Sequence, residues 1–144
     1  MPISEKLTRM PSEVVICIDR IEKGRLIFGR VYNRYSKKAS RFTDVVSLFE
    51  ILEKLMNSIS FPGQTVRYRT FKKTASEVTE LEIAKKKVWS HKELFKQNGE
   101  ERTLFLSIIS RNNSTWQGEV YFLEGDLNYQ FKSEIELMDF IYTI

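Results

Sequence analysis

Apolar residues along the chain form two series of short segments in the same order. In the first series an almost continuously apolar run, 14–18, precedes a polar turn, a second run over 26–35 and a short run ending at Phe42. In the second series the corresponding runs are 104–109, 116–123 and a short run ending at Phe131. Apolar runs rich in β-branched and aromatic residues are typical of strands covered on both faces. Each series therefore predicts a three-stranded meander.

The spacing of apolar residues changes after each meander to the three-and-four spacing of an amphipathic helix. Asp44 and Ser133 stand where an N-cap is expected, and Ser133 with Glu136 has the spacing of a capping box. The stretch "FPGQ", 61–64, is expected to end the first helix. The residues that form the two apolar faces are Val45, Leu48, Phe49, Leu52, Leu55, Met56 and Ile59, and Leu137, Met138, Phe140, Ile141 and Ile144.

The two series also match each other directly. A shift of 89 positions superimposes residues 14–55 on residues 103–144 without a gap. The fold class predicted is α+β: two similar meander-plus-helix units, 14–59 and 103–144, with helices covering antiparallel sheet, built by internal duplication. The identical pairs are Gly29 with Gly118, Val31 with Val120, Tyr32 with Tyr121, Phe42 with Phe131, and Leu48 with Leu137.

A charged segment, 72–100, connects the two units, and we expect it to carry less of the core. Within it "EVTELEIAKKKVW", 77–89, fits either a helix or an alternating strand, and the preceding "TVRYRTF", 65–71, fits an additional strand. The stretch "SHKELFKQNG", 90–99, predicts a short helix because Ser90 and Glu93 form a capping box and Gly99 ends it. The length of 144 residues fits one domain, 1–144.

Composition places the chain among globular proteins, with 42% hydrophobic and 29% charged residues. No run approaches the roughly 18 apolar residues of a membrane span, and the single cysteine, Cys17, has no disulfide partner, so we expect a cytoplasmic protein. The charge is uneven. Residues 1–76 carry 15 Lys and Arg against 7 Asp and Glu, and residues 77–144 carry 8 against 12. This division favours an acidic partner for the first half or contact between copies of the chain.

The residues "ISRNNSTWQGEVYF" and "FKSEIELMDFI" resemble the C-terminal part of a group of small uncharacterised proteins from Gram-positive bacteria. The stretches "FGRVYNRY" and "FPGQTVRYRTF" resemble the group's first half, so the resemblance covers most of the chain outside 74–100. The chain departs from the group at Lys132, where the group has Arg, and in "EIELM", where the group has a plainer Glu-Leu helix start. The resemblance implies a bacterial cytoplasmic protein with a domain of unknown function, and it implies no catalytic residues.

The sharpest local feature is the stretch around Trp116, Gln117 and Arg111. One interpretation is an aromatic platform beside a cation, which stacks a base or anchors a partner protein. The other is a hairpin in which Trp116 covers the sheet edge and Gly118 permits a bulge or a close backbone approach. A polar turn needs these residue types in either case.

A second candidate is the basic stretch "GRVYNRYSKKASRF", 29–42, in which Tyr32 and Tyr35 alternate with cations. Such a surface suits phosphates and stacked bases, although a solvated strand face has the same composition. Arg67, Arg69, Lys72 and Lys73 extend it if they fold nearby. The possible anion or nucleic-acid contacts are Arg30, Arg34, Lys37, Lys38 and Arg41.

Sequence signals for catalysis are sparse. His91 and Cys17 are single, Lys85–Lys87 is typical of helix surface, and no metal-ligand spacing, phosphate-binding loop or dinucleotide fingerprint occurs, so neither metal nor cofactor is predicted. The sequence favours a non-enzymatic protein-interaction or regulatory module that binds a protein partner or itself. A nucleic-acid-binding module that uses the basic first hairpin is the alternative.

Overall fold

The computed structural model describes residues 10–23, 26–62, 64–65 and 87–144. The described elements are β1 (Val14–Glu22), β2 (Leu26–Asn33), β3 (Ser40–Phe42), α1 (Val45–Ile59), β4 (Gln64–Thr65), α2 (His91–Leu94), β5 (Arg102–Asn112), β6 (Gln117–Phe122), β7 (Leu127–Phe131) and α3 (Glu134–Thr143). The expected α+β class is confirmed, as is the order of strands and helix in each half. The alternatives raised for 66–86 lie outside the described residues.

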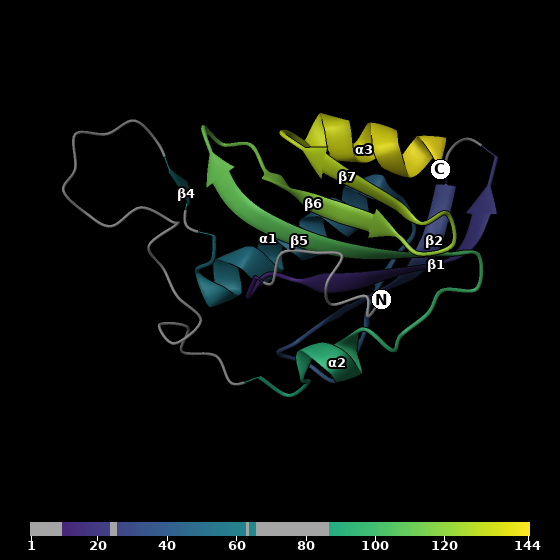
Figure 1. Cartoon of the computed structure of the whole chain (residues 1–144), viewed down its shortest axis with the longest axis horizontal. Coiled ribbons are helices and arrows are strands. Elements are labelled where there is room, and N and C mark those ends of the chain that lie inside the picture. The colour runs from purple at the N-terminus through teal and green to yellow at the C-terminus, as the bar shows by residue number, and fades with distance from the viewer. Residues whose placement is uncertain (1–9, 24–25, 63, 66–86) are drawn as a thin grey trace.

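Six of the strands form one antiparallel sheet in the order β3-β2-β1-β5-β6-β7, and the short β4 pairs with β5 in parallel (Figure 1). Strands β1 and β5 pair with each other and so connect the two meanders. They pair from Val14 with Leu106 to Ile18 with Arg102, and Val15 faces Phe105 near the middle. The two meanders are therefore halves of a single sheet.

The sequence predicts that one shift of 89 residues relates every position of the two halves. In the structure that shift holds for the later strands, and β1 and β5 are related by a shift of 90. Gly29 pairs with Phe42 as Gly118 pairs with Phe131, a shift of 89. The β-bulges, however, follow Ile18 in β1 and Ile108 in β5, a shift of 90. Because a one-residue slip moves a side chain to the other face of a strand, the shift of 90 keeps the core residues of β1 and β5 on the same face.

Helices α1 and α3 cover one face of the sheet. Six residues of the predicted α1 face are buried, and Phe49 is half-buried. Asp44 caps this helix by accepting the Ser47 N–H at 2.7 Å, and the Ser47 hydroxyl accepts the Asp44 N–H, so the expected N-cap is confirmed as a full capping box. The helix ends at Ser60, which adopts a left-handed conformation with φ of 54°.

The start of α3 meets the prediction in part. The Ser133 hydroxyl accepts the Glu136 N–H at 3.2 Å, as expected of an N-cap. The Glu136 carboxylate, however, accepts the N–H of Lys132 at 3.3 Å instead of that of Ser133, so the predicted reciprocal bond is wrong by one residue. The carboxylate thereby ties the helix to the end of β7.

Residues in and next to α2 cover part of the opposite face of the sheet. Leu94 and Phe95 pack against Val15 and Phe105, and the Phe95 and Phe105 ring centroids are 4.7 Å apart. The predicted capping box at the start of α2 is confirmed, since Glu93 accepts the Ser90 N–H and Ser90 accepts the Glu93 N–H. The connecting segment nevertheless contributes to the core here, because Leu94 is fully buried. No helix within the described ranges is long and apolar enough to cross a membrane.

Equivalent glycines in β2 and β6 allow the strands to approach closely. A Cβ atom on Gly118 would lie 2.2 Å from the Ser107 carbonyl oxygen and 2.9 Å from the Phe131 ring, and one on Gly29 would lie 1.9 Å from the Cys17 oxygen.

We expect Gly118→Ala to lower the free energy of unfolding by about 1–3 kcal/mol, because the added methyl group would force β5, β6 and the Phe131 ring apart. Urea denaturation measures this, with Gln130→Ala on exposed β7 as the control; an unchanged midpoint would contradict the expectation.

Candidate functional site

Trp116 lies between the two halves of the molecule, buried to 5% exposure. Its ring packs on Phe49 of α1 with centroids 5.2 Å apart, and its Nε1–H donates to Glu53 Oε2 at 3.1 Å. Its backbone N–H donates to Glu134 in the first turn of α3 at 2.7 Å. One residue of the second hairpin therefore contacts both helices that cover the sheet.

Arg111 reaches the same helix from the end of β5. Its Nε donates to the Pro62 carbonyl, and its NH1 donates to Asn57 Oδ1 at 2.8 Å and lies 3.6 Å from Glu53 Oε1. Burial lowers the pKa of the Arg111 guanidinium, and the Glu53 carboxylate opposes that shift. Because a buried cation needs such partners, Arg111 fixes the C-terminal end of α1 against the second half of the sheet.

Gln117 organises the turn between β5 and β6. Its Nε2 donates to Thr115 Oγ1 at 2.7 Å, and its Oε1 accepts the Ser110 hydroxyl at 2.8 Å and the Asn112 N–H at 2.9 Å. The described contacts of Arg111, Trp116 and Gln117 are therefore those of a hairpin that holds α1. The half-buried Gln117 is the most exposed of the three.

The fold separates the cations of the basic stretch 29–42 into two that pair with carboxylates and three that are exposed. Arg30 pairs with Asp19 through two hydrogen bonds of 2.9 and 3.0 Å, and this contact lowers the pKa of Asp19 and raises that of Arg30. Arg34 lies 3.5 Å from the buried carboxylate of Glu13. Both of these predicted anion contacts are thus engaged by carboxylates of the chain itself.

The other three cations lie on the surface. Lys37 and Lys38 are exposed in the turn between β2 and β3, and Arg41 is exposed on β3, directly opposite Arg30 in the strand pair. Like charges on facing positions repel, and Asp19 beside Arg30 offsets that repulsion. The structure brings Arg30 and Arg41 together, whereas Arg34 lies apart from both in the contact with Glu13.

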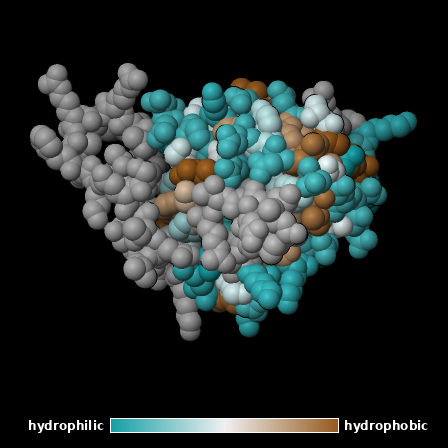
Figure 2. Space-filling view, in the orientation of Figure 1, coloured by the Kyte–Doolittle hydropathy of each residue, from teal (hydrophilic) through white to brown (hydrophobic). Residues whose placement is uncertain are grey.

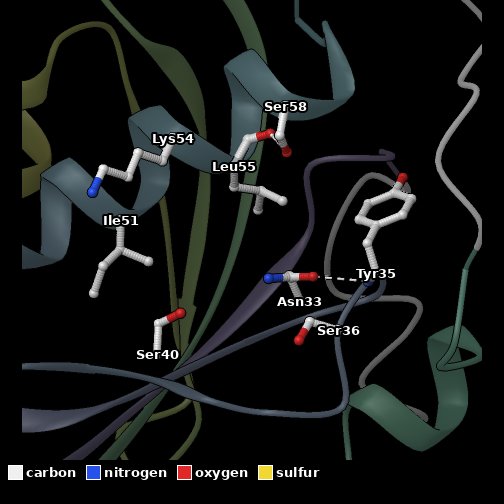
Figure 3. A pocket seen from close by; sticks show the side chains of 8 residues that line it. All are labelled: Asn33, Tyr35, Ser36, Ser40, Ile51, Lys54, Leu55 and Ser58. Atoms are coloured by element: carbon white, nitrogen blue, oxygen red, sulfur yellow. Dashed lines mark hydrogen bonds between the residues drawn. The ribbon is translucent and has the colours of Figure 1, made fainter.

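A pocket of about 340 Å³ lies on the helix side of the sheet, between the end of β2, β3 and the C-terminal half of α1 (Figure 3). Asn33, Ser40 and Lys54 supply polar groups, and Ile51 and Leu55 supply an apolar wall. Sequence reasoning missed this pocket because its residues come from three elements. The only local signal was the accumulation of polar residues between Asn33 and Ser40.

The exposed apolar residues are a second feature that the sequence did not single out. Leu127, at the start of β7, is 50% exposed, and Ile135, in the first turn of α3, is 67% exposed. Val46 of α1 occupies the position equivalent to Ile135 and is 66% exposed. Figure 2 shows mainly hydrophilic side chains on the described surface in that view, with hydrophobic ones in small groups.

Cys17 and His91 are the single cysteine and the single histidine of the chain. Cys17 is fully buried in β1, and burial raises the pKa of its thiol to about 12. The side chain of His91 lies outside what the structure describes. Among the described residues no three His, Cys, Asp or Glu side chains gather as a metal site.

Comparison of the chain with protein-family models, curated proteins and solved structures gives no match. The resemblance to a Gram-positive bacterial group therefore stays a prediction.

Replacing Trp116 measures how much its ring contributes to the stability of the folded protein. We expect Trp116→Ala to lower the free energy of unfolding by about 3–5 kcal/mol, since it removes a buried aromatic side chain. Trp116→Phe keeps an aromatic ring beside Phe49 but loses the second ring of the indole and the bond to Glu53, so its loss should be smaller than that of the alanine variant, about 1–3 kcal/mol. Chemical denaturation followed by circular dichroism compares the two. A loss within about 0.5 kcal/mol for the alanine variant would rule out a core role.

The Cys17 thiol should be unreactive in the folded protein. The reactive form is the thiolate, so a pKa of about 12 together with full burial predicts negligible labelling by a disulfide reagent at about pH 8. Labelling should follow unfolding across a urea series and become complete in the denatured chain. Rapid labelling without denaturant would show instead that the thiol is accessible.

Proposed function

We propose that this protein is a non-enzymatic interaction module of the bacterial cytoplasm, and that it binds a strand of a partner protein along β7. The observation that carries this proposal is the outer edge of β7. It has no strand partner among the described residues and contains neither charge, proline nor bulge from Leu127 to Phe131. Edges without charge, proline or bulge pair readily with another chain.

The opposite edge of the sheet differs. Strand β3 has only three residues, one of them the exposed Arg41, and Lys37 and Lys38 lie in the turn before it. Short length and positive charge are features by which proteins prevent edge-to-edge association. The contrast between the two edges supports β7 as the binding edge.

Two exposed apolar residues flank β7 in the chain. Leu127 stands at its first residue, and Ile135 follows its last residue by four positions. A β-branched residue at an exposed helix position gains nothing from burial and has modest helix propensity, so Ile135 has no evident role inside the fold. We define the β7 edge surface as the outer backbone of Leu127–Phe131 with the side chains of Leu127 and Ile135.

We also infer that the two halves arose by duplication of one meander-plus-helix unit. Three observations support this: the shared element order, the glycine against a phenylalanine in each half, and the equivalent bulges. The duplication explains why Val46 and Ile135 occupy equivalent positions. It also supplies a matched control for the experiment below.

Lysine substitutions on the β7 edge surface should abolish partner binding without unfolding the protein. The double variant Leu127→Lys, Ile135→Lys places two charges beside the edge, and the free energy of unfolding should change by less than about 1 kcal/mol because both positions are exposed. Val46→Lys is the matched control at the equivalent position on α1. Binding is measured by affinity capture from lysate of the encoding organism, with and without nuclease, and self-association by sedimentation.

The outcomes separate the candidate functions. A protein bound by the wild type and by Val46→Lys but lost from the double variant supports the β7 edge. A protein retained by the double variant contradicts it. Recovery of nucleic acid, or loss of every partner on nuclease treatment, favours the alternative function through the exposed Lys37, Lys38 and Arg41, whose neutralisation should then weaken a salt-dependent affinity.

A further inference from the structure

The pocket between the β2–β3 turn and α1 is lined in part by hydrogen-bond donors that have no acceptor among the described residues. Asn33 shows this most clearly. Its Oδ1 accepts the Tyr35 N–H at 2.8 Å. A backbone N–H can only donate, so the oxygen of the amide must face Tyr35 and the Nδ2 group must face the other way. Figure 3 shows that nitrogen directed between Ser40 and α1.

Two further donors come from different elements. Ser40 of β3 points its hydroxyl toward the same space, and Lys54 extends from α1 at its rim (Figure 3). Within the described part of the chain the Asn33 Nδ2 group, the Ser40 hydroxyl and the Lys54 ammonium donate to no other protein group. The amide and the hydroxyl thus face one space from two strands, and the flexible Lys54 side chain, whose ammonium lies apart from both in Figure 3, belongs to the rim of the same pocket.

The surroundings favour a negative charge. Among the residues that the structure describes, no carboxylate lines the pocket. Two of the last carbonyls of α1, whose partial negative charge opposes an anion, are engaged: that of Met56 accepts the Phe61 N–H, and that of Asn57 accepts the Ser60 N–H. Ile51 and Leu55 provide an apolar wall for the uncharged part of a ligand. The volume of about 340 Å³ is at the lower end of small-molecule sites.

We propose that this pocket binds a small metabolite that carries a phosphate or carboxylate group. The anionic group accepts hydrogen bonds from Asn33 Nδ2 and Ser40 Oγ and pairs with Lys54, and the carbon skeleton lies on Ile51 and Leu55. Charge-assisted bonds of this type are the stronger ones in proteins. The site goes beyond the proposed partner binding and is independent of it, since β3 and β7 are opposite edges of the sheet.

The test is a titration of the full chain with three probes: inorganic phosphate, glycerol phosphate and succinate. Binding is followed by calorimetry and by the NMR signals of the side-chain amides. We expect saturable binding that shifts the Asn33 side-chain amide signal. Glycerol phosphate as the tightest ligand would identify a phosphate ester, and succinate as the tightest would identify a carboxylate.

Asn33→Asp is the discriminating variant. The aspartate keeps an oxygen for the Tyr35 N–H, so the fold should be retained, but it replaces the free donor with a negative charge. We expect the affinity for the tightest probe to fall at least roughly tenfold, and Lys54→Gln to weaken it by a similar factor. Lys92→Gln removes the same charge from exposed α2 on the other face of the sheet and should leave the affinity unchanged.

The proposal is overturned if no probe shifts the Asn33 amide signal, or if Asn33→Asp binds as the wild type does. An equal loss in Lys92→Gln would also overturn it, because binding would then reflect net charge alone. The β7 double variant should bind the probe normally. Failure of partner binding and failure of the pocket are therefore distinguishable.

Discussion

The pairing of β1 with β5 is the contact on which the rest of the structure depends. It joins strands from opposite ends of the chain, and the residues on both sides of the Val15 and Phe105 pair are fully buried. A three-stranded meander alone would leave this apolar strand as an open edge, which invites association. Pairing the two meanders removes both edges at once and creates a central region covered by α1 and α3 on one face and by Leu94 and Phe95 on the other.

Once the halves share a sheet, side chains of one half can stabilise the other. Trp116 and Arg111 of the second hairpin both reach α1 of the first half, and Glu53 accepts from Trp116 while it pairs with Arg111. At the position of Trp116 the first half has Ile27, which is buried but has no polar group to reach α3. The halves are thus alike in topology and unlike in the polar contacts between them. The residues that looked most suited to bind a partner hold the two halves together.

The same arrangement decides which surfaces are left for binding. The sheet ends in two different edges, the short and positively charged β3 and the longer, uncharged β7. The pocket adjoins β3 and the proposed strand-binding edge is β7, so a small anion and a protein partner would occupy separate places. Within the basic stretch 29–42, pairing of Arg30 and Arg34 with the carboxylates of Asp19 and Glu13 leaves the exposed positive charge in the β2–β3 turn and on β3.

The sequence by itself determined the features that depend on neighbours in the chain. Strand and helix periods, the caps at Asp44, Ser133 and Ser90 and the match of Gly29 with Gly118 are local patterns, and they predicted the elements and their order. Only the tertiary structure decided which strands pair and whether Trp116 and Arg111 face solvent or α1. It also decided that β1 and β5 are equivalent at a shift of 90 residues, one more than the shift predicted from the sequence. It also brought Asn33, Ser40 and Lys54 to one cavity. These outcomes depend on contacts between residues far apart in the chain, and neither residue type nor spacing specifies which distant surface will cover a given side chain.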